Sequence, residues 1–166
     1  MTTKKPARPS VARPKGAQVK KSAPQAGTVR VAAIQMASGP SVPANLAEAE
    51  QLIELAVDAG ARLVVLPEFF CIMAMKDTYV VKAREAEGHG PIQTFLSRVA
   101  KKHKIWLVGG SVPLEASVPN KVRNSCLVFD DAGRRVARYD KIHLFGYQSG
   151  TEHYEESRTI EAGGEA

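Results

Sequence analysis

The sequence predicts an α/β fold in which strands alternate with helices and a hairpin follows. Apolar runs rich in β-branched residues recur along the chain, and the segments between them carry apolar side chains at helical spacing. Glycine and proline, which break regular structure, separate these segments. With 166 residues, the chain is long enough for one domain of typical size.

The first half of the chain is predicted to form a strand, a helix and a second strand. Residues 29–36 are β-branched and apolar, and the glycine and prolines of 38–43 indicate a loop. Residues 45–58 have the apolar spacing of a helix that ends before Gly60. Residues 63–66 are continuously apolar, as in a strand buried on both faces. Such a βαβ unit is expected to be right-handed.

The second half is predicted to contain a further helix, a strand and a hairpin. Pro91 suits the first turn of the helix, and an Asp-Asp-Ala-Gly sequence at 130–133 is typical of a hairpin turn. The expected segments are a short helix near 77–87, a helix at 91–104, a strand at 105–110, a loop at 111–121, hairpin strands at 122–129 and 134–139, and a polar segment at 146–166.

The positive charge of the chain is confined to its first residues. Residues 1–27 contain seven of the 23 lysines and arginines and none of the 17 acidic residues, so the rest of the chain carries a net charge of −1. Because this stretch is proline-containing and poor in apolar residues, we predict a disordered basic tail at 1–27. A solvated linker, or residues upstream of the true start, is the favoured interpretation. A basic arm on phosphates and a transit peptide are the alternatives.

Composition also limits the class and location of the protein. No apolar stretch has the length of a membrane span, and no secretory leader is evident. Cys71 and Cys126 lie far apart without metal-ligand spacing, so we expect no disulfide framework, no zinc site and a cytoplasmic location. No glycine-rich phosphate loop follows the first strand, which argues against nucleotide binding. A nucleic-acid partner is not expected, because only the tail is basic.

Two charged residues stand at the ends of predicted strands, where α/β enzymes place their chemistry. Glu68 follows Pro67 and precedes Phe69 and Phe70, whose rings would desolvate the carboxylate and make it a stronger base. The alternative is a solvated acid in a loop. Lys141 follows the last hairpin strand and could stabilise an oxyanion, although most lysines are solvated surface charges.

The remaining candidates are weaker. Cys126 lies inside a predicted strand, where a small buried hydrophobic side chain is expected. Cys71 follows Glu68 by three residues, but no partner histidine is evident to activate it as a nucleophile. His143 falls on the same side as Lys141 if the strand continues, and a structural role is preferred for it.

Taken together, several segments resemble the nitrilase, or carbon-nitrogen hydrolase, superfamily. The matching segments occur in the order of the family and lie at 31–36, 63–69, 109–113, 124–125, 128–130 and 139–145. Residues 154–158 resemble the branch that contains ω-amidases and deaminated-glutathione amidases. The resemblance covers about residues 29–166.

This resemblance implies an α-β-β-α sandwich and a Glu-Lys-Cys triad that hydrolyses non-peptide carbon-nitrogen bonds. Glu68 matches the general base, Lys141 matches the residue that stabilises the tetrahedral intermediate, and Glu156 matches a second, supporting glutamate. It also implies a small-molecule amide substrate, a homo-oligomer, and neither a metal nor an organic cofactor.

One part of the family pattern is not matched. The nucleophilic cysteine of the family follows the second glutamate at some distance, and neither Cys71 nor Cys126 occupies that position. We therefore expect residues 28–166 to be the N-terminal part of a carbon-nitrogen hydrolase domain, incomplete in this chain and inactive alone. The alternatives are a non-catalytic binding or scaffold protein with this fold, and a nucleic-acid-associated protein that acts through its tail.

Overall fold

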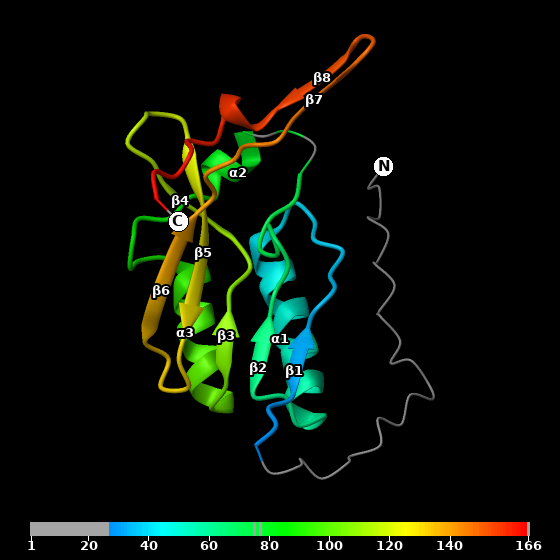
Figure 1. Cartoon of the computed structure of the whole chain (residues 1–166), viewed down its shortest axis with the longest axis vertical. Coiled ribbons are helices and arrows are strands. Elements are labelled where there is room, and N and C mark those ends of the chain that lie inside the picture. Colours follow the sequence, from blue (N-terminus) through cyan, green and yellow to red (C-terminus); the bar gives the residue numbers. More distant parts are fainter. Residues whose placement is uncertain (1–26, 75, 77, 166) are drawn as a thin grey trace, which may run out of the picture.

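The computed structural model describes residues 27–74, 76 and 78–165 (Figure 1). Apart from Gly27, the tail predicted to be disordered lies outside these residues. In chain order the elements are β1 (Val31–Ala33), α1 (Val42–Asp58), β2 (Leu63–Val65), α2 (Thr78–Lys82), α3 (Pro91–His103), β3 (Trp106–Val108), β4 (Val112–Glu115), β5 (Val122–Phe129), β6 (Arg135–Asp140), β7 (Gly146–Ser149), β8 (Glu152–Glu155) and the 3-10 helix η1 (Glu156–Arg158).

Six of the described strands form one mixed sheet in the order β1-β2-β3-β5-β4, with β6 on the other edge of β5. Strands β1, β2 and β3 are parallel, as helical crossover connections require. Strand β5 is antiparallel to its neighbours; β3 and β4 share one of its edges and β6 occupies the other. Strands β7 and β8 form a separate hairpin that projects from the sheet (Figure 1). Strand β5 therefore holds the antiparallel half of the sheet together.

The predicted order of helices and strands is confirmed, and some boundaries differ. Helix α1 begins at Val42, three residues before its predicted start, because Pro43 fits the first turn of a helix. The prediction of a loop at 111–121 was wrong, since this segment contains β4. Pro113 weakens the strand signal there, yet β4 pairs with β5 at an edge of the sheet, where proline is tolerated. The polar segment 146–166 also contains the hairpin of β7 and β8.

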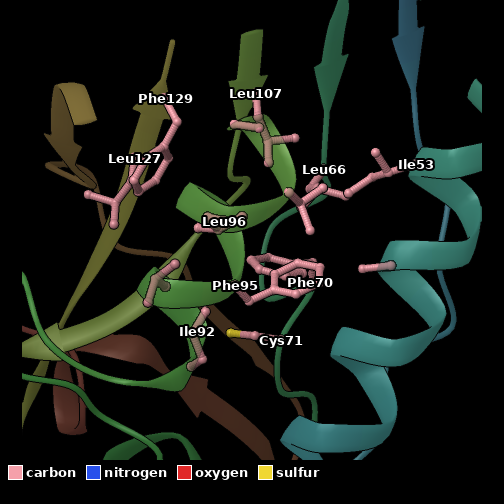
Figure 2. Packing of buried hydrophobic residues seen from close by; sticks show 14 of the residues in the cluster. Ile53, Leu66, Phe70, Cys71, Ile92, Phe95, Leu96, Leu107, Leu127 and Phe129 are labelled. Atoms are coloured by element: carbon pink, nitrogen blue, oxygen red, sulfur yellow. The ribbon is translucent and has the colours of Figure 1, made fainter. Parts of the chain in front are cut away.

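The hydrophobic core lies between the sheet and helices α1 and α3 (Figure 2). Leu107 and Leu127 extend from the sheet and are fully buried, as is Leu96 of α3. Phe70, from the segment after β2, stacks on Phe95 of α3 with ring centroids 6.5 Å apart. Truncating a buried phenylalanine typically costs roughly 3–5 kcal/mol. Phe70 therefore anchors the segment that carries Glu68.

Helices α1 and α3 lie on one face of the sheet, and the opposite face is called the open face below (Figure 1). Val31, Leu63 and Trp106 are paired across β1, β2 and β3. Their side chains share the open face, because the neighbouring Val64 and Leu107 point into the core. Trp106 is 47% exposed. The candidate site lies on this open face.

An ion pair joins α1 and α3 on the outside of the molecule. Glu50 accepts hydrogen bonds from both terminal nitrogens of Arg98, at 2.8 and 2.9 Å, and from Lys102 at 3.1 Å. The hydrogen bond from Arg98 chiefly, opposed by partial burial and assisted by Lys102, lowers the pKa of Glu50 from 4.5 to about 2. Because this folded-state pKa is below the unfolded value, the stabilisation is complete above pH 4.5 and is lost as the pH falls toward 2.

We expect Glu50→Gln to lower the free energy of unfolding by roughly 1 kcal/mol at neutral pH, a small value because Arg98 is 50% exposed and solvent screens the pair. The difference from wild type should vanish as the pH approaches 2, where the wild-type carboxyl group becomes protonated. Urea unfolding across this pH range measures it. Glu48→Gln on the same helix is the control, since Glu48 has no ion pair with a described residue. A difference that persists in acid contradicts the prediction.

Candidate active site

Glu68 lies in a turn directly after β2, at the carboxyl end of the parallel strands. Leu66 still donates its backbone N–H to Val108 of β3, and the chain then leaves the sheet. Phe69 adopts a left-handed backbone conformation with φ 51°, which is uncommon for a residue other than glycine. Its N–H donates to Ser111 Oγ at 2.8 Å. Residues in such conformations concentrate at functional sites. Here the left-handed conformation of Phe69 lets Glu68 and the core-facing Phe70 point in different directions.

The two phenylalanines do not enclose the Glu68 carboxylate. Phe70 points into the core behind the sheet, and Phe69 packs against the small cluster of Val81, Val122 and Ile160. The side chain of Glu68 is 54% exposed. Of the two interpretations of Glu68, the solvated acid in a loop is confirmed and the desolvated carboxylate is not, because the turn directs each ring away from the acid.

Lys141 is the first residue after β6, as predicted, and both its backbone N–H and its carbonyl are hydrogen-bonded. Its N–H donates to the carbonyl of Asn124 at 3.0 Å, and its carbonyl accepts the N–H of Gly163 at 2.9 Å. Its ammonium lies 3.2 Å from Glu68 Oε1 and 3.0 Å from Glu156. Partial burial alone would lower the pKa of Lys141, but the hydrogen bonds to Glu156 and Glu68 outweigh it and raise the pKa above its usual value. Lys141 is therefore a cation at neutral pH.

Glu156 begins the 3-10 helix η1 and is buried. Besides the ammonium of Lys141, its carboxylate accepts the backbone N–H of Phe145 at 2.7 Å. The same helix returns the chain to the sheet, where Ile160 forms a bridge with Val122 of β5. The structure thus brings together all three predicted site residues, which are far apart in the sequence.

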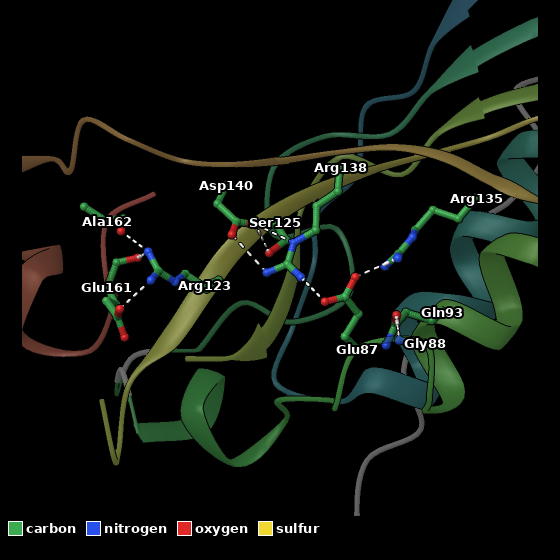
Figure 3. Close-up of polar contacts among 10 residues, drawn as sticks. All are labelled: Glu87, Gly88, Gln93, Arg123, Ser125, Arg135, Arg138, Asp140, Glu161 and Ala162. Carbon is green, nitrogen blue, oxygen red and sulfur yellow. Dashed lines mark hydrogen bonds and ion pairs between the residues drawn. The ribbon is translucent and has the colours of Figure 1, made fainter. Parts of the chain in front are cut away.

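Asp140, which precedes Lys141, is fixed by contacts of its own (Figure 3). Its carboxylate accepts a hydrogen bond from Ser125 Oγ at 2.6 Å and one from each of two nitrogens of Arg138, both at 2.9 Å. Burial alone would raise the pKa of Asp140, but these hydrogen bonds outweigh it and lower the pKa. Arg138 also donates to Glu87 at 2.6 Å. The end of β6 is therefore held in place, and Lys141 extends from a fixed point.

A pocket of about 380 Å³ lies on the open face beside these charges. Glu68 and Lys141 contribute to it, together with Asn124, Cys126 and Tyr139. The sequence assigned no role to Asn124 or Tyr139. The pairing of Cys126 with Tyr139 across β5 and β6 is the feature that puts both on the open face, and it depends on the strand register.

The two cysteines occupy opposite faces of the sheet. Cys71 is fully buried in the core beside Ile92 (Figure 2), and burial raises its pKa to about 12. It therefore does not face Glu68 despite its closeness in sequence. Cys126 was expected to be buried, but it is half-buried and lines the pocket, because β5 presents it on the open face. Burial raises the pKa of Cys126 as well.

His143 is exposed, and β6 ends before it at Asp140, so the alternation that would align it with Lys141 does not apply. Within the described part of the chain, no group of three or more histidine, cysteine or acidic side chains is arranged to hold a metal ion. No helix among the described residues is both long and apolar enough to cross a bilayer.

Comparison with known proteins identifies the family. The family model described as carbon-nitrogen hydrolase matches residues 30–165. The chain belongs to the carbon-nitrogen hydrolase family. The resemblance inferred from the sequence motifs is thereby confirmed.

This carbon-nitrogen hydrolase chain has relatives that are named as amidases. It is 35% identical over 136 residues to the deaminated glutathione amidase of Yersinia enterocolitica, covering 80% of this chain and 47% of that protein. It is 37% identical over 123 residues to the chloroplastic omega-amidase of Arabidopsis thaliana, covering 72% of this chain and 33% of that protein. The chain thus spans about a third to a half of the length of these relatives.

The fold is shared with solved members of the nitrilase superfamily. The crystal structure of Saccharomyces cerevisiae Nit3, a member of branch 10 of that superfamily, matches with a TM-score of 0.69 and 31% identity, covering 82% of this chain and 49% of Nit3. The predicted nitrilase-type α/β fold is confirmed by this match.

Gly110 is required for the turn that carries Glu68. Its φ is +55°, and a Cβ added there would lie 2.0 Å from the carbonyl oxygen of Pro67. We expect Gly110→Ala to lower the free energy of unfolding by roughly 3 kcal/mol or more, because the clash adds to the left-handed strain. Gly88→Ala is the matched control, since Gly88 also has a positive φ but open space around it. Gly88→Ala should lower the free energy of unfolding by about 1 kcal/mol. Equal losses in urea unfolding would contradict this.

The two cysteines should differ in reactivity. Iodoacetamide at pH 8 should label Cys126 in the folded protein and leave Cys71 unmodified, because a buried thiol of pKa about 12 presents almost no thiolate. Peptide mapping by mass spectrometry measures both sites. Labelling in urea is the control, and both cysteines should react there. Faster labelling of Cys71 than of Cys126 in the folded chain would show that Cys71 is accessible.

Proposed function

We propose that this chain forms the N-terminal part of an amidase domain, residues 28–166, that hydrolyses the carbon-nitrogen bond of a small amide. The observation that carries the proposal is the ammonium of Lys141 held between Glu68 and Glu156 beside a pocket. The two curated relatives named above act, by their names, on deaminated glutathione and on ω-amides. Short carboxylic acids with a terminal amide are therefore the proposed substrates.

The chemistry requires a thiol in addition to these residues. In the proposed reaction a thiol sulfur forms a bond to the amide carbon while Glu68 takes the thiol proton. The carbon-nitrogen bond then breaks, and that proton leaves with the nitrogen as ammonia or an amine. Water next attacks the thioester carbon while Glu68 takes a proton from the water. The carbon-sulfur bond then breaks, Glu68 returns the proton to the sulfur, and the carboxylic acid and the free thiol are released.

Lys141 and Glu156 have different proposed roles in this cycle. The cation of Lys141 stabilises the negative oxygen of each tetrahedral intermediate. Its raised pKa supports this role, because a lysine that stays protonated cannot act as the base. Glu156 contacts the same ammonium from a buried position and keeps it in place when Glu68 changes its protonation.

The two thiols of this chain are poor candidates for the nucleophile. Cys71 lies in the core, away from the pocket, and Cys126 extends from the middle of a strand with a raised pKa. We therefore propose that the nucleophile is supplied by a segment equivalent to the part of the relatives that this chain does not match. The proposal extends to a homo-oligomeric, cytoplasmic protein without a cofactor.

The test is a chimera of residues 28–165 with the part of the Yersinia amidase that this chain does not match. We expect it to release ammonia from α-ketoglutaramate or deaminated glutathione, and we expect the unfused chain to release none. Glu68→Gln should lower kcat/KM roughly 100-fold or more, the usual contribution of a general base, and Lys141→Met by a similar factor.

Cys126→Ser in the chimera is the control and should retain activity. If the unfused chain shows turnover, and Cys126→Ser or Cys71→Ala abolishes it, the nucleophilic thiol lies within this chain. That result would overturn the proposal that another segment supplies the nucleophile. A folded chimera that remains active after Glu68→Gln would overturn the proposed base.

A further inference from the structure

Asn124 contacts both charged residues of the pocket through two different groups. Its side-chain Nδ2 donates to Glu68 Oε1 at 2.6 Å, and its carbonyl accepts the N–H of Lys141 at 3.0 Å. Asn124 lies within β5 and is 3% exposed, whereas Glu68 lies in a turn and is half exposed. The buried strand residue is therefore the fixed partner, and the carboxylate is the group that it holds.

These contacts distinguish the two oxygens of Glu68. Oε1 accepts hydrogen bonds from Asn124 Nδ2 and, at 3.2 Å, from Lys141 Nζ. Oε2 accepts none from any described residue. A general base needs a lone pair directed at the proton that it takes. Since two donors already occupy Oε1, Oε2 is the oxygen available for proton transfer.

The other side-chain atom of Asn124 gives no benefit to folding. Its Oδ1 is buried and has no hydrogen-bond partner among the described residues. A buried acceptor without a partner destabilises the folded state, and a leucine of nearly the same shape would avoid that penalty. Leucine cannot make the bond to Glu68. The hydrogen bond to Glu68 is therefore the contact that asparagine provides at position 124 and that leucine would not.

We propose that Asn124 is a positioning residue for the carboxylate base: its amide holds Oε1 of Glu68 and leaves Oε2 to accept the proton of the thiol and later of water. This inference rests on the proposed amidase function for its chemistry. The contact itself, and the order that it imposes on Glu68, can be measured in the chain alone.

The first measurement compares two buried asparagines. Asn45 is 2% exposed, and its amide bonds to both backbone groups of Gly39 and to the carbonyl of Cys71. Asn45→Leu should lower the urea midpoint, because it leaves these groups unpaired. Asn124→Leu should leave the midpoint unchanged or raise it. If Asn124→Leu lowers the urea midpoint as much as Asn45→Leu does, Asn124 has a structural role and the proposal is overturned.

The second measurement is the order of the Glu68 side chain by NMR. Three-bond couplings should report one rotamer in wild type and an average of several in Asn124→Leu, because a methyl group cannot hold Oε1. The Asn124 Nδ2 proton should also lose its downfield shift in Glu68→Ala. A Glu68 side chain that remains in one rotamer in Asn124→Leu would overturn the proposal.

The third measurement separates this inference from the proposed function. In the chimera, Asn124→Leu should lower kcat roughly 100-fold with little change in KM, as expected for a displaced catalytic group. An active chimera that Asn124→Leu does not impair would overturn the positioning role. If the wild-type chimera is inactive, the amidase function is overturned. If its Glu68 side chain is nevertheless ordered, and becomes disordered with Asn124→Leu, the positioning of Glu68 by Asn124 is supported.

Discussion

The pairing of β5 with strands on both of its edges is the constraint on which the site depends. Glu68 comes from the parallel half of the sheet and Lys141 from the end of the antiparallel half. Strand β5 lies between these halves, and Asn124 contacts both residues. A shift of one residue in the register would turn Asn124 and Cys126 toward the helices and remove them from the pocket. The site is thus a consequence of the strand register as much as of its charged residues.

The three charged groups differ in burial, and this difference supports the separate roles proposed for them. Glu156 is buried, and a buried carboxylate needs a counter-charge and hydrogen bonds, which Lys141 and the N–H of Phe145 supply. Glu68 is half exposed and bonds to the same ammonium at a longer distance. The buried glutamate therefore fixes the lysine, and Oε2 of the exposed one is left without a hydrogen bond from a described residue.

The site lies on the face of the sheet opposite helices α1 and α3. Val65, Val108 and Cys126 form the apolar part of the pocket, and Trp106 extends the same face away from it. In a nitrilase-type sandwich a second sheet packs on such a face, so the resemblance implies that the charges would be enclosed between two sheets. Exclusion of water would strengthen the attraction of Lys141 for a developing oxyanion.

The sequence alone determined the local elements and the identity of the family. The βαβ unit, the hairpin, and the positions of Glu68 and Lys141 at strand ends all follow from patterns within a few residues. Only the tertiary structure decided that these two residues meet, since 73 positions separate them, and that Glu156 joins them. It also decided the exposure of Glu68, the strand β4, the pocket position of Cys126 and the contact made by Asn124. Periodicity predicts that a residue lies in a strand, whereas its face and its neighbours depend on pairing between distant segments.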